Sequence, residues 1–480
     1  DLDLALFRVY ENNKPLHTEN YLKWNAAGAG EDELVFVAGH PGSTQRNNTM
    51  AQFVTERDVV EPNWLRVFKN WINVLKSYGA QGTEQARQSG STIFFLENAQ
   101  KASIGRLAGL QDKNVFAKKE REEQDFKARV MANPQWAKEA GTAWDEIAQA
   151  EAAWAPRAKQ QFFRNLNYTL GERALQIVRY VVEVKKPDGE RLPGYHEAQL
   201  ESLRQVMFSP APVYPAMEIA QITGILELAR QELGPDDEWV KAVLSGQQPA
   251  DLARDVISST KVADPAFRKQ LVEGGVAAVE KSTDPFIMLA RRIDPISRSM
   301  IKWREDHYES IVTRAGEKLG KARFLVYGKS AYPDATFTLR LSYGRVAGYP
   351  MNVTKAPSKT TFYGLYDRAA SFDFAGPFDL PSRWKEGRNQ LNLSTPMDFV
   401  SSNDIIGGNS GSPVINQKAE LVGLIFDGNI ESLVGDFIYD ETANRAVSVH
   451  SGAMIEALRK IYNAGKLADE LQGTGLSGTN

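Results

Sequence analysis

The pattern of hydrophobic and polar residues changes twice along the chain. Residues 1–47 and 322–480 carry short apolar or alternating runs separated by Gly, Asn and Pro, which are typical of β-strands joined by turns. Residues 48–321 between them carry apolar residues at the spacing of α-helices. We therefore predict a β + α protein in which a β-barrel is interrupted by a large inserted helical domain.

The outer segments contain several runs that predict individual elements. Leu4–Tyr10 and Glu33–Ala38 are short apolar or alternating runs of strand length. Ser451–Ile461 is amphipathic and predicts a closing helix. Thr336–Tyr343 alternates strictly, and successive side chains of a strand point to opposite faces. One face of this strand is therefore expected to carry Phe337, Leu339, Leu341 and Tyr343.

The middle segment marks several helix starts with an Asx residue followed by proline. A short polar side chain at the N-cap accepts a hydrogen bond from an unpaired backbone N–H, and proline at the next position loses no useful donor. This pattern predicts helices that begin after Asn133, Asp264 and Asp284. Apolar residues within 64–75 also recur at helical spacing and predict a further helix.

The composition excludes several classes of protein. Of the 480 residues, 42% are hydrophobic and 24% are charged, which is ordinary for a globular protein. The formal net charge of −3 gives no reason to expect binding to nucleic acid or to an anionic membrane, and no apolar run is long enough to span a bilayer. The absence of cysteine excludes disulfides and thiolate metal sites. We expect neither a metal nor a cofactor.

The most informative motif is the octet Gly407–Val414, which reads Gly-Gly-Asn-Ser-Gly-Ser-Pro-Val. Glycines on both sides of Ser410 allow a sharp turn that holds neighbouring N–H groups in one direction. This geometry suits a nucleophile whose attack creates an oxyanion, because the amides of Gly408 and Ser410 can both donate to it. The buried strand predicted at Glu420–Phe426 favours this interpretation over a simple turn between strands. We therefore predict that Ser410 is a nucleophile with an oxyanion hole formed by these two amides.

The octet resembles the nucleophile segment of chymotrypsin-clan serine peptidases, Gly-Asp-Ser-Gly-Gly-Pro, with Asn409 replacing the aspartate and Ser412 replacing the third glycine. Further segments, in the same order along the chain, resemble the bacterial dipeptidyl aminopeptidases of the dipeptidyl-peptidase 7 and 11 type, with the 7 subtype closer. Because unrelated segments match in register, this resemblance is more specific than one motif. The matching segments are Asp3–Tyr10, Phe36–Gly42, Pro333–Arg340, Asn403–Pro413 and Phe426–Asn429.

The resemblance implies a chymotrypsin-like double β-barrel with an inserted helical domain that caps the cleft. It also implies a serine exopeptidase that releases dipeptides from the free N-terminus of oligopeptides and works as a periplasmic homodimer. In this family Asp3 would be the carboxylate that orients the catalytic base.

The catalytic base is the missing member of this arrangement. In the chymotrypsin clan the histidine precedes the aspartate, but only Asp1 and Leu2 precede Asp3. His40 is the one histidine beside a predicted strand end, and its position after Asp3 breaks the order of the clan. We therefore expect this chain to be the C-terminal part of a peptidase, inactive alone, whose first barrel is absent or forms a separate chain. The other histidines are His17, His196, His307 and His450.

The resemblance also assigns the substrate-binding positions. Phe426, Asp427 and Gly428 fall where this clan lines its specificity pockets, and in the family the aspartate binds the free α-amino group of the substrate by a charge-assisted hydrogen bond. Gly428 leaves an uncharged space where an arginine would pair with an acidic P1 side chain, so aliphatic or aromatic P1 residues are expected. Asn98 resembles the asparagine at the amino-terminal end of the substrate; an ordinary exposed helix asparagine is the alternative.

Two alternative functions remain open from the sequence. Asp404 has the spacing to Ser410 of the carboxylate that selects basic P1 residues in trypsin-like endopeptidases, although it would also serve as a loop-fixing acceptor for backbone N–H groups. A chain without a base could instead be a peptide-binding fragment or pseudoenzyme. Substrates with free and blocked N-termini separate the exopeptidase from the endopeptidase. A histidine upstream of Asp3 separates the enzyme from the binding protein.

Overall fold

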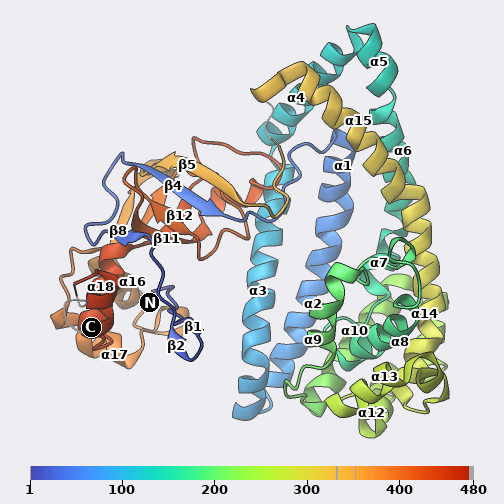
Figure 1. Ribbon diagram of the computed structural model, residues 1–480. Coiled ribbons are helices and arrows are strands. Elements are labelled where there is room, and N and C mark those ends of the chain that lie inside the picture. Colours follow the sequence, from blue (N-terminus) through green and yellow to red (C-terminus); the bar gives the residue numbers. More distant parts are fainter. Residues whose placement is uncertain (1, 331–332, 352, 475–480) are drawn as a thin grey trace. The chain divides into compact units, whose positions relative to one another are not determined.

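The computed structural model describes residues 2–330, 333–351 and 353–474, which form two compact units (Figure 1). Residues 1–48 and 332–480 make up the β unit, and residues 49–331 make up the helical unit. The second boundary lies at 331/332 rather than at the predicted 321/322. It lies later because α15 (Ser310–Tyr327) and a following 3-10 turn (Gly328–Ser330) continue the helical unit.

The β unit is built on one mainly antiparallel sheet with the strand order β5-β4-β10-β11-β12-β9-β8. A short strand, β3, pairs with β11 in parallel beside this path. The strands are β3 (Lys23–Trp24), β4 (Leu34–Gly39), β5 (Arg340–Arg345), β8 (Lys359–Thr361), β9 (Pro396–Ser401), β10 (Pro413–Ile415), β11 (Glu420–Gly428) and β12 (Ala446–His450). The strands predicted at Glu33–Ala38 and Glu420–Phe426 are therefore confirmed as β4 and β11.

The sheet curls so that the residue after β5 meets the end of β9, although the two strands are far apart in the strand order. Val346 and Ser401 form an antiparallel bridge, and Ser402 N donates to Arg345 O at 2.9 Å. Buried and less buried residues alternate along β4 and β9, which leaves one face of each strand in the interior of the curl. The core of this interior includes Val35, Val37, Val346, Phe399, Val414, Val422 and Ile425. The double barrel implied by the resemblance stays a prediction.

Helices cover one end of the β unit. α18 (Ser451–Lys460) confirms the predicted closing helix, and it packs through Ala453 and Ala457 into a second apolar cluster with Phe362 and Trp384. The remaining elements of the unit are α16 (Phe362–Ser371), α17 (Ser382–Gly387), α19 (Gly465–Leu471) and the short hairpins β1 (Tyr10–Glu11) with β2 (Lys14–Pro15) and β6 (Tyr349–Met351) with β7 (Thr354–Ala356).

Two sequence expectations about strands need correction. Leu4–Tyr10 is not a strand, because the described residues before Tyr10 have no neighbouring strand to complete their hydrogen bonds. Thr336–Tyr343 is a strand only from Arg340 onward. Of its apolar row only Leu341 and Tyr343 belong to the strand, because Phe337 has a φ of 60° and Phe337 and Leu339 precede β5. All four side chains are exposed, with exposed fractions of 67%, 68%, 62% and 73% for Phe337, Leu339, Leu341 and Tyr343.

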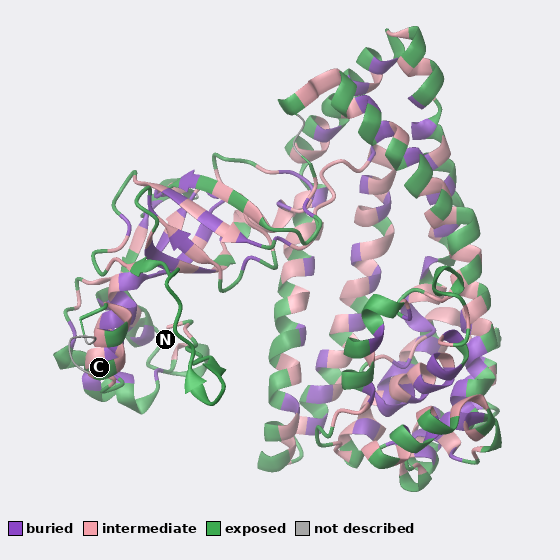
Figure 2. Cartoon of the chain, viewed as in Figure 1, coloured by how far each residue is buried: buried purple, intermediate pink, exposed green. Residues whose placement is uncertain are grey.

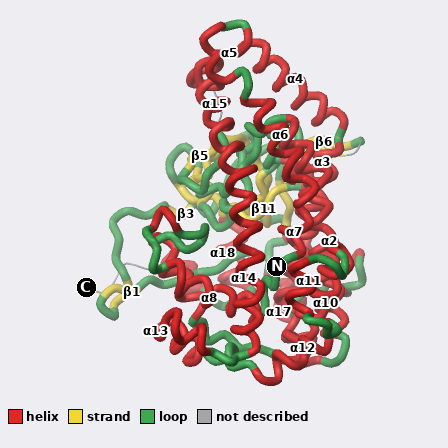
Figure 3. The backbone as a smooth tube through the Cα atoms, turned by 90° about the vertical axis from the view of Figure 1, so that its right-hand side faces the viewer, coloured by secondary structure: helices red, strands yellow, loops and turns green. Residues whose placement is uncertain are grey.

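The helical unit contains no strand among its described residues (Figure 3). The three predicted N-caps are confirmed: the side chains of Asn133, Asp264 and Asp284 each accept from a backbone N–H in the first turn of the following helix. The helices are α1 (Met50–Thr55), α2 (Glu61–Gly79), α3 (Thr83–Gln111), α4 (Lys113–Met131), α5 (Pro134–Ala140), α6 (Ala143–Trp154), α7 (Ala158–Phe163), α8 (Leu170–Glu183), α9 (Leu200–Met207), α10 (Pro215–Leu233), α11 (Glu238–Leu244), α12 (Pro249–Ser259), α13 (Pro265–Lys281), α14 (Pro285–Arg304) and α15.

The largest apolar core of the helical unit lies among α8, α10, α11 and α14, where buried residues are concentrated (Figure 2). It includes Ile177, Ile225, Trp239 and Phe286, each almost completely buried. Within the described ranges, none of the helices combines the length and the hydropathy needed to cross a membrane.

Candidate active site

The nucleophile loop (Gly407–Ser412) leads into β10 and lies between two flanking segments. β10 pairs with β4 on one side and with β11 on the other, so the loop lies beside the residues that follow β4 and beside the end of β11. On the first side Gly42 N donates to Gly407 O at 2.8 Å. On the second side Gly411 N donates to Ile425 O at 2.8 Å. The sheet therefore fixes the loop from both sides.

Two glycines allow the loop to approach the end of β4 closely. Gly408 has a φ of 107°, which side chains rarely adopt, and a Cβ there would meet His40 O and lie 2.8 Å from Gly42 N. A Cβ on Gly39 would meet the Oδ1 of Asn409 and lie 2.5 Å from the Oγ of Ser412. The backbone of Gly408 therefore packs on the backbone of His40–Gly42, and the backbone of Gly39 packs on the side chains of Asn409 and Ser412.

Ser410 presents an exposed hydroxyl at the centre of this loop. Its Oγ donates to Phe426 O at 3.3 Å. A β-bulge between Ile425 and Asp427 takes Phe426 out of the pairing with β12, which leaves its carbonyl available to the serine. The predicted nucleophile and the predicted substrate-binding segment are therefore neighbours.

The two predicted oxyanion donors, the N–H groups of Gly408 and Ser410, have no acceptor among the described residues. Three adjacent amides do have acceptors, since Asn409 N donates to Ile406 O at 3.2 Å, Gly411 N to Ile425 O, and Ser412 N to Asn409 O at 2.9 Å. Two unpaired N–H groups beside an exposed hydroxyl can stabilise an oxyanion formed at that hydroxyl. Their role as an oxyanion hole stays a prediction.

Asp404 takes part in a bidentate salt bridge. The guanidinium of Arg46 donates to its two carboxylate oxygens at 2.5 and 2.8 Å, and the two side chains are only 13% and 15% exposed. Arg46 Nε also donates to Gly435 O at 2.8 Å, which ties three segments of the β unit together. A guanidinium thus anchors Asp404, where the sequence suggested backbone N–H donors. A carboxylate paired in this way is not available to select a basic P1 side chain.

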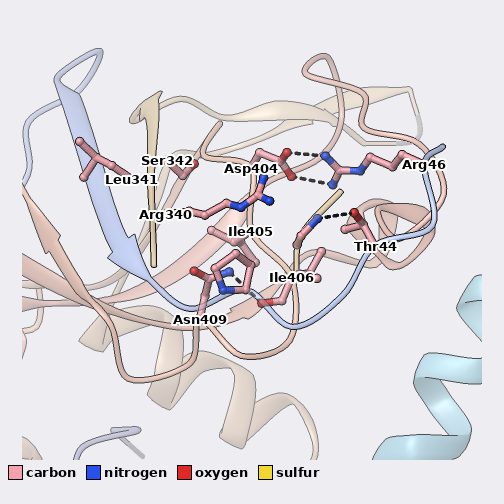
Figure 4. A pocket seen from close by; sticks show the side chains of 11 residues that line it. Thr44, Arg46, Arg340, Leu341, Ser342, Asp404, Ile405, Ile406 and Asn409 are labelled. Carbon is pink, nitrogen blue, oxygen red and sulfur yellow. Dashed lines mark hydrogen bonds and ion pairs between the residues drawn. The ribbon is translucent and has the colours of Figure 1, made fainter. Parts of the chain in front are cut away.

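A cavity of about 180 Å³ adjoins the nucleophile loop on the side of Asn409 (Figure 4). Arg340 reaches into it and donates to Pro333 O at 3.1 Å and to Asp334 O. No local sequence pattern indicates this cavity, because its walls come from segments far apart in the chain. They are Pro41, Thr44, Arg46, Ala335, Arg340, Leu341, Ser342, Asp404, Ile405, Ile406 and Asn409.

Asp427 and Gly428 lie at the end of β11, immediately after the bulge. The carboxylate of Asp427 is exposed, and its Oδ1 accepts from Gly428 N at 2.8 Å. A Cβ on Gly428 would meet the Oγ of Ser432, which itself donates to Asn429 O at 2.7 Å. Any side chain at position 428 therefore requires Ser432 to move.

Asp3 is exposed and lies beside Asp398 of β9. Burial raises the pKa of Asp398 to about 6, and the negative charge of Asp3 adds to this shift. β12 separates β9 from β11, so Asp398 and the strand beside Ser410 are about 10 Å apart in the sheet. The structure does not bring Asp3 to Ser410, and the role of Asp3 as the orienting carboxylate stays a prediction.

No hydrogen bond among the described residues joins a histidine to Ser410 or to Asp3. The histidine segment closest to the nucleophile loop is that of His40, whose carbonyl faces Gly408. The exposed ring of His40 lies 6.2 Å from that of Phe337. The sequence placed His40 only beside a strand end, and the contact with the nucleophile loop depends on the pairing of β4 with β10.

The other histidines have different surroundings. His450 is buried at the start of α18, where its Nδ1 accepts from Gly452 N at 3.1 Å. Burial, helped by the charge of Lys359, lowers the pKa of His450 to about 4. His17 lies in the exposed N-terminal segment, and His196 and His307 belong to the helical unit.

Asn98 lies exposed on α3 of the helical unit. Its predicted contact with the amino-terminal end of a substrate stays a prediction. Within the described part of the chain, His, Asp and Glu side chains nowhere gather in groups of three or more that could hold a metal ion.

Comparison with known sequences matches the chain to one peptidase family and to dipeptidyl-peptidases. The sequence profile of the Peptidase S46 family matches residues 1–473. The Asp/Glu-specific dipeptidyl-peptidase of Shewanella putrefaciens is 27% identical over 538 aligned residues, which cover 98% of this chain and 70% of that protein. Dipeptidyl-peptidase 7 of Capnocytophaga gingivalis is 25% identical, with 98% of this chain and 68% of that protein covered.

Comparison with solved structures shows the same fold. DPP11 of Porphyromonas endodontalis in complex with the dipeptide Arg-Glu superposes with a TM-score of 0.75 at 18% identity, covering 96% of this chain and 68% of that one. Its complex with the dipeptide Arg-Asp gives a TM-score of 0.72 with the same coverage.

Proposed function

The chain belongs to the Peptidase S46 family, and from this premise we propose that it is a serine exopeptidase that releases dipeptides from the free N-terminus of oligopeptides. One observation carries the proposal: the exposed hydroxyl of Ser410 donates to Phe426 O, and the N–H groups of Gly408 and Ser410 in the same loop have no acceptor among the residues that the structure describes. We assign the nucleophile and the oxyanion donors to this one turn, and the carboxylate that binds the substrate to the end of β11. The resemblance adds a periplasmic location and a homodimer, which we retain as predictions.

In the proposed reaction Ser410 Oγ attacks the carbonyl carbon of the second substrate residue. The amides of Gly408 and Ser410 then stabilise the oxyanion, the peptide amine leaves, and water hydrolyses the acyl-enzyme. A histidine base must take the proton from Ser410 and give it to the leaving amine. Asp3 would orient this histidine.

The exposed carboxylate of Asp427 supports recognition of a free N-terminus. One of its oxygens accepts from Gly428 N, which leaves acceptor capacity for a substrate ammonium. A charge-assisted hydrogen bond from the substrate ammonium to Asp427 would favour substrates with a charged amino end, and we propose that it sets the cut two residues from that end. Asn98 is proposed as a second ligand of that end.

The same strand end supports an aliphatic or aromatic P1 residue. Position 428 carries no side chain, and Phe426 beside it is partly buried and apolar. A basic P1 residue is disfavoured because Asp404 is already paired with Arg46. One related protein is named an Asp/Glu-specific dipeptidyl-peptidase and another dipeptidyl-peptidase 7, so their names do not decide the P1 preference of this chain. The proposed preference therefore rests on the residues of this chain.

The test uses dipeptidyl reporters with a free amino group and their N-acetylated counterparts, assayed with the full-length protein, which here means the form that also contains the predicted histidine base. We expect hydrolysis of the free reporter, at least tenfold slower hydrolysis of the acetylated one, and loss of both in Ser410→Ala. Ser412→Ala is the matched control, and it should retain most of the activity. Equal rates on the two reporters would contradict the exopeptidase, and activity in Ser410→Ala would contradict the nucleophile.

A further inference from the structure

The nucleophile loop leads into β10, so Ser410 has β4 on one side and β11 on the other. On the β11 side lie Asp427 and Gly428, to which the proposed function assigns the two residues before the cut. On the β4 side lies the segment His40–Gly42, which contacts Gly408 through His40 O and Gly42 N. An extended peptide advances about 3.3 Å per residue. A peptide that runs from the β11 side across Ser410 toward β4 would place the residues after the cut over the β4 side within one or two positions of the scissile bond.

Phe337 is presented on this second side in a strained conformation. Its φ is 60°, which a bulky residue rarely adopts, and its side chain is 67% exposed. The surroundings enforce this conformation, because Phe337 N donates both to Pro41 O at 3.0 Å and to Gly42 O at 2.6 Å. Strained residues held by their surroundings cluster at functional sites. The segment His40–Gly42 thus anchors Phe337 and contacts the nucleophile loop.

The ring of Phe337 forms an exposed pair with His40. The ring centroids are 6.2 Å apart at an interplanar angle of 51°, within the range of an aromatic contact. Both rings are open to solvent, while the backbone beneath them is fixed. A third ring or a flat apolar side chain can pack on such a pair without rearrangement of the protein.

We propose that His40 and Phe337 form the subsite for the leaving part of the peptide, and that this subsite favours an aromatic side chain within the first two residues after the scissile bond. The inference rests on the proposed function and adds a specificity on the other side of the cut. The role proposed for both residues is contact with the substrate.

The test compares peptides that have a free N-terminus, Leu at P1 and either Trp or Ala at the first or second leaving position. We expect the wild-type protein to cleave the better Trp peptide with a kcat/KM about 3- to 10-fold above the Ala peptide. In Phe337→Gly this ratio should fall to about 1. Glycine suits the positive φ and keeps the donor N–H, so the variant removes the ring and retains the backbone. Phe337→Asn, which also tolerates this conformation, should give the same result.

Tyr343→Ala is the matched control, because Tyr343 is 73% exposed in the same apolar row but lies on β5. It should keep the wild-type ratio. A ratio near 1 in the wild type, or one that survives in both Phe337 variants, would overturn the subsite while the proposed function stands. Failure of the wild type to hydrolyse a dipeptidyl reporter that lacks leaving residues would overturn the proposed function and the subsite together.

Discussion

At Gly408 the nucleophile loop has no room for a Cβ, so both the conformation of the loop and the position of its donor N–H depend on this glycine. We predict that Gly408→Ala lowers kcat/KM by about 100-fold or more, because the new methyl group forces the turn away from Gly42 and displaces the donor N–H. Reporter hydrolysis and the melting temperature would be measured together. Gly407→Ala is the control, since a Cβ there meets nothing within 4 Å. Equal effects of the two substitutions would contradict the assigned turn geometry.

A substitution at Gly428 tests the proposed P1 preference, again through a single residue. Gly428→Arg would place a guanidinium on the pocket wall, where it pairs with an acidic P1 side chain and is costly beside an apolar one. Since its Cβ would meet Ser432, the substitution belongs in a Ser432→Gly background, with Ser432→Gly alone as the control. We expect the ratio of kcat/KM for Asp over Leu at P1 to rise about ten- to a few-hundredfold. An unchanged ratio would show that Gly428 does not line the pocket for the P1 side chain.

Individual residues were predictable where the chemistry lies within a few consecutive positions. Ser410, Gly408 and Asp427 belong to short motifs, so their neighbourhood could be inferred from the sequence. The salt bridge between Arg46 and Asp404 could not be inferred, because its partners are 358 positions apart and meet only through the sheet. The strain at Phe337 likewise depends on a carbonyl pair from a different segment.

At the scale of elements, His450 joins the end of β12 to the start of α18. Its neutral imidazole caps the helix by accepting from Gly452 N, and its pKa of about 4 lies below the ordinary value of 6.5. The contribution of this group to stability is therefore complete above about pH 6.5 and is lost as the pH falls toward 4. The loss amounts to about 3 kcal/mol over this range.

We predict that His450→Asn, which keeps a capping side chain but cannot titrate, flattens the decline in melting temperature between pH 7 and pH 4.5. The comparison with wild type at each pH cancels the opposite contribution of Asp398, whose raised pKa of about 6 favours the fold at low pH. A decline as steep in the variant as in the wild type would show that the fold does not lower the pKa of His450.

Elements were predictable where their signals are local. The Asx-Pro starts after Asn133, Asp264 and Asp284 succeeded because capping depends on a few adjacent groups. Leu4–Tyr10 failed because a strand also needs a partner, which no local pattern reports. The alternation of Thr336–Tyr343 predicted the strand face only for Leu341 and Tyr343, and alternation alone does not say that this face is exposed.

At the scale of the whole molecule, the β unit is assembled from both ends of the sequence. β4 comes from the first 48 residues, and its partners β5 and β10 come from the residues after 331. The change of hydrophobic pattern is enough to predict this interruption. The pattern does not predict the register that places His40 and the end of β11 on opposite sides of Ser410, because this register follows from long-range strand pairing.

The most direct measurement of the central claim is covalent labelling by a dipeptidyl phosphonate ester with Leu at P1, followed by mass spectrometry of the full-length protein. The account predicts one adduct, on Ser410 and not on Ser412, which forms at least tenfold faster from the probe with a free amino group than from its N-acetylated form. An adduct at another residue, no adduct, or equal rates from the two probes would contradict the assignment of this chain as a serine dipeptidyl-peptidase that uses Ser410.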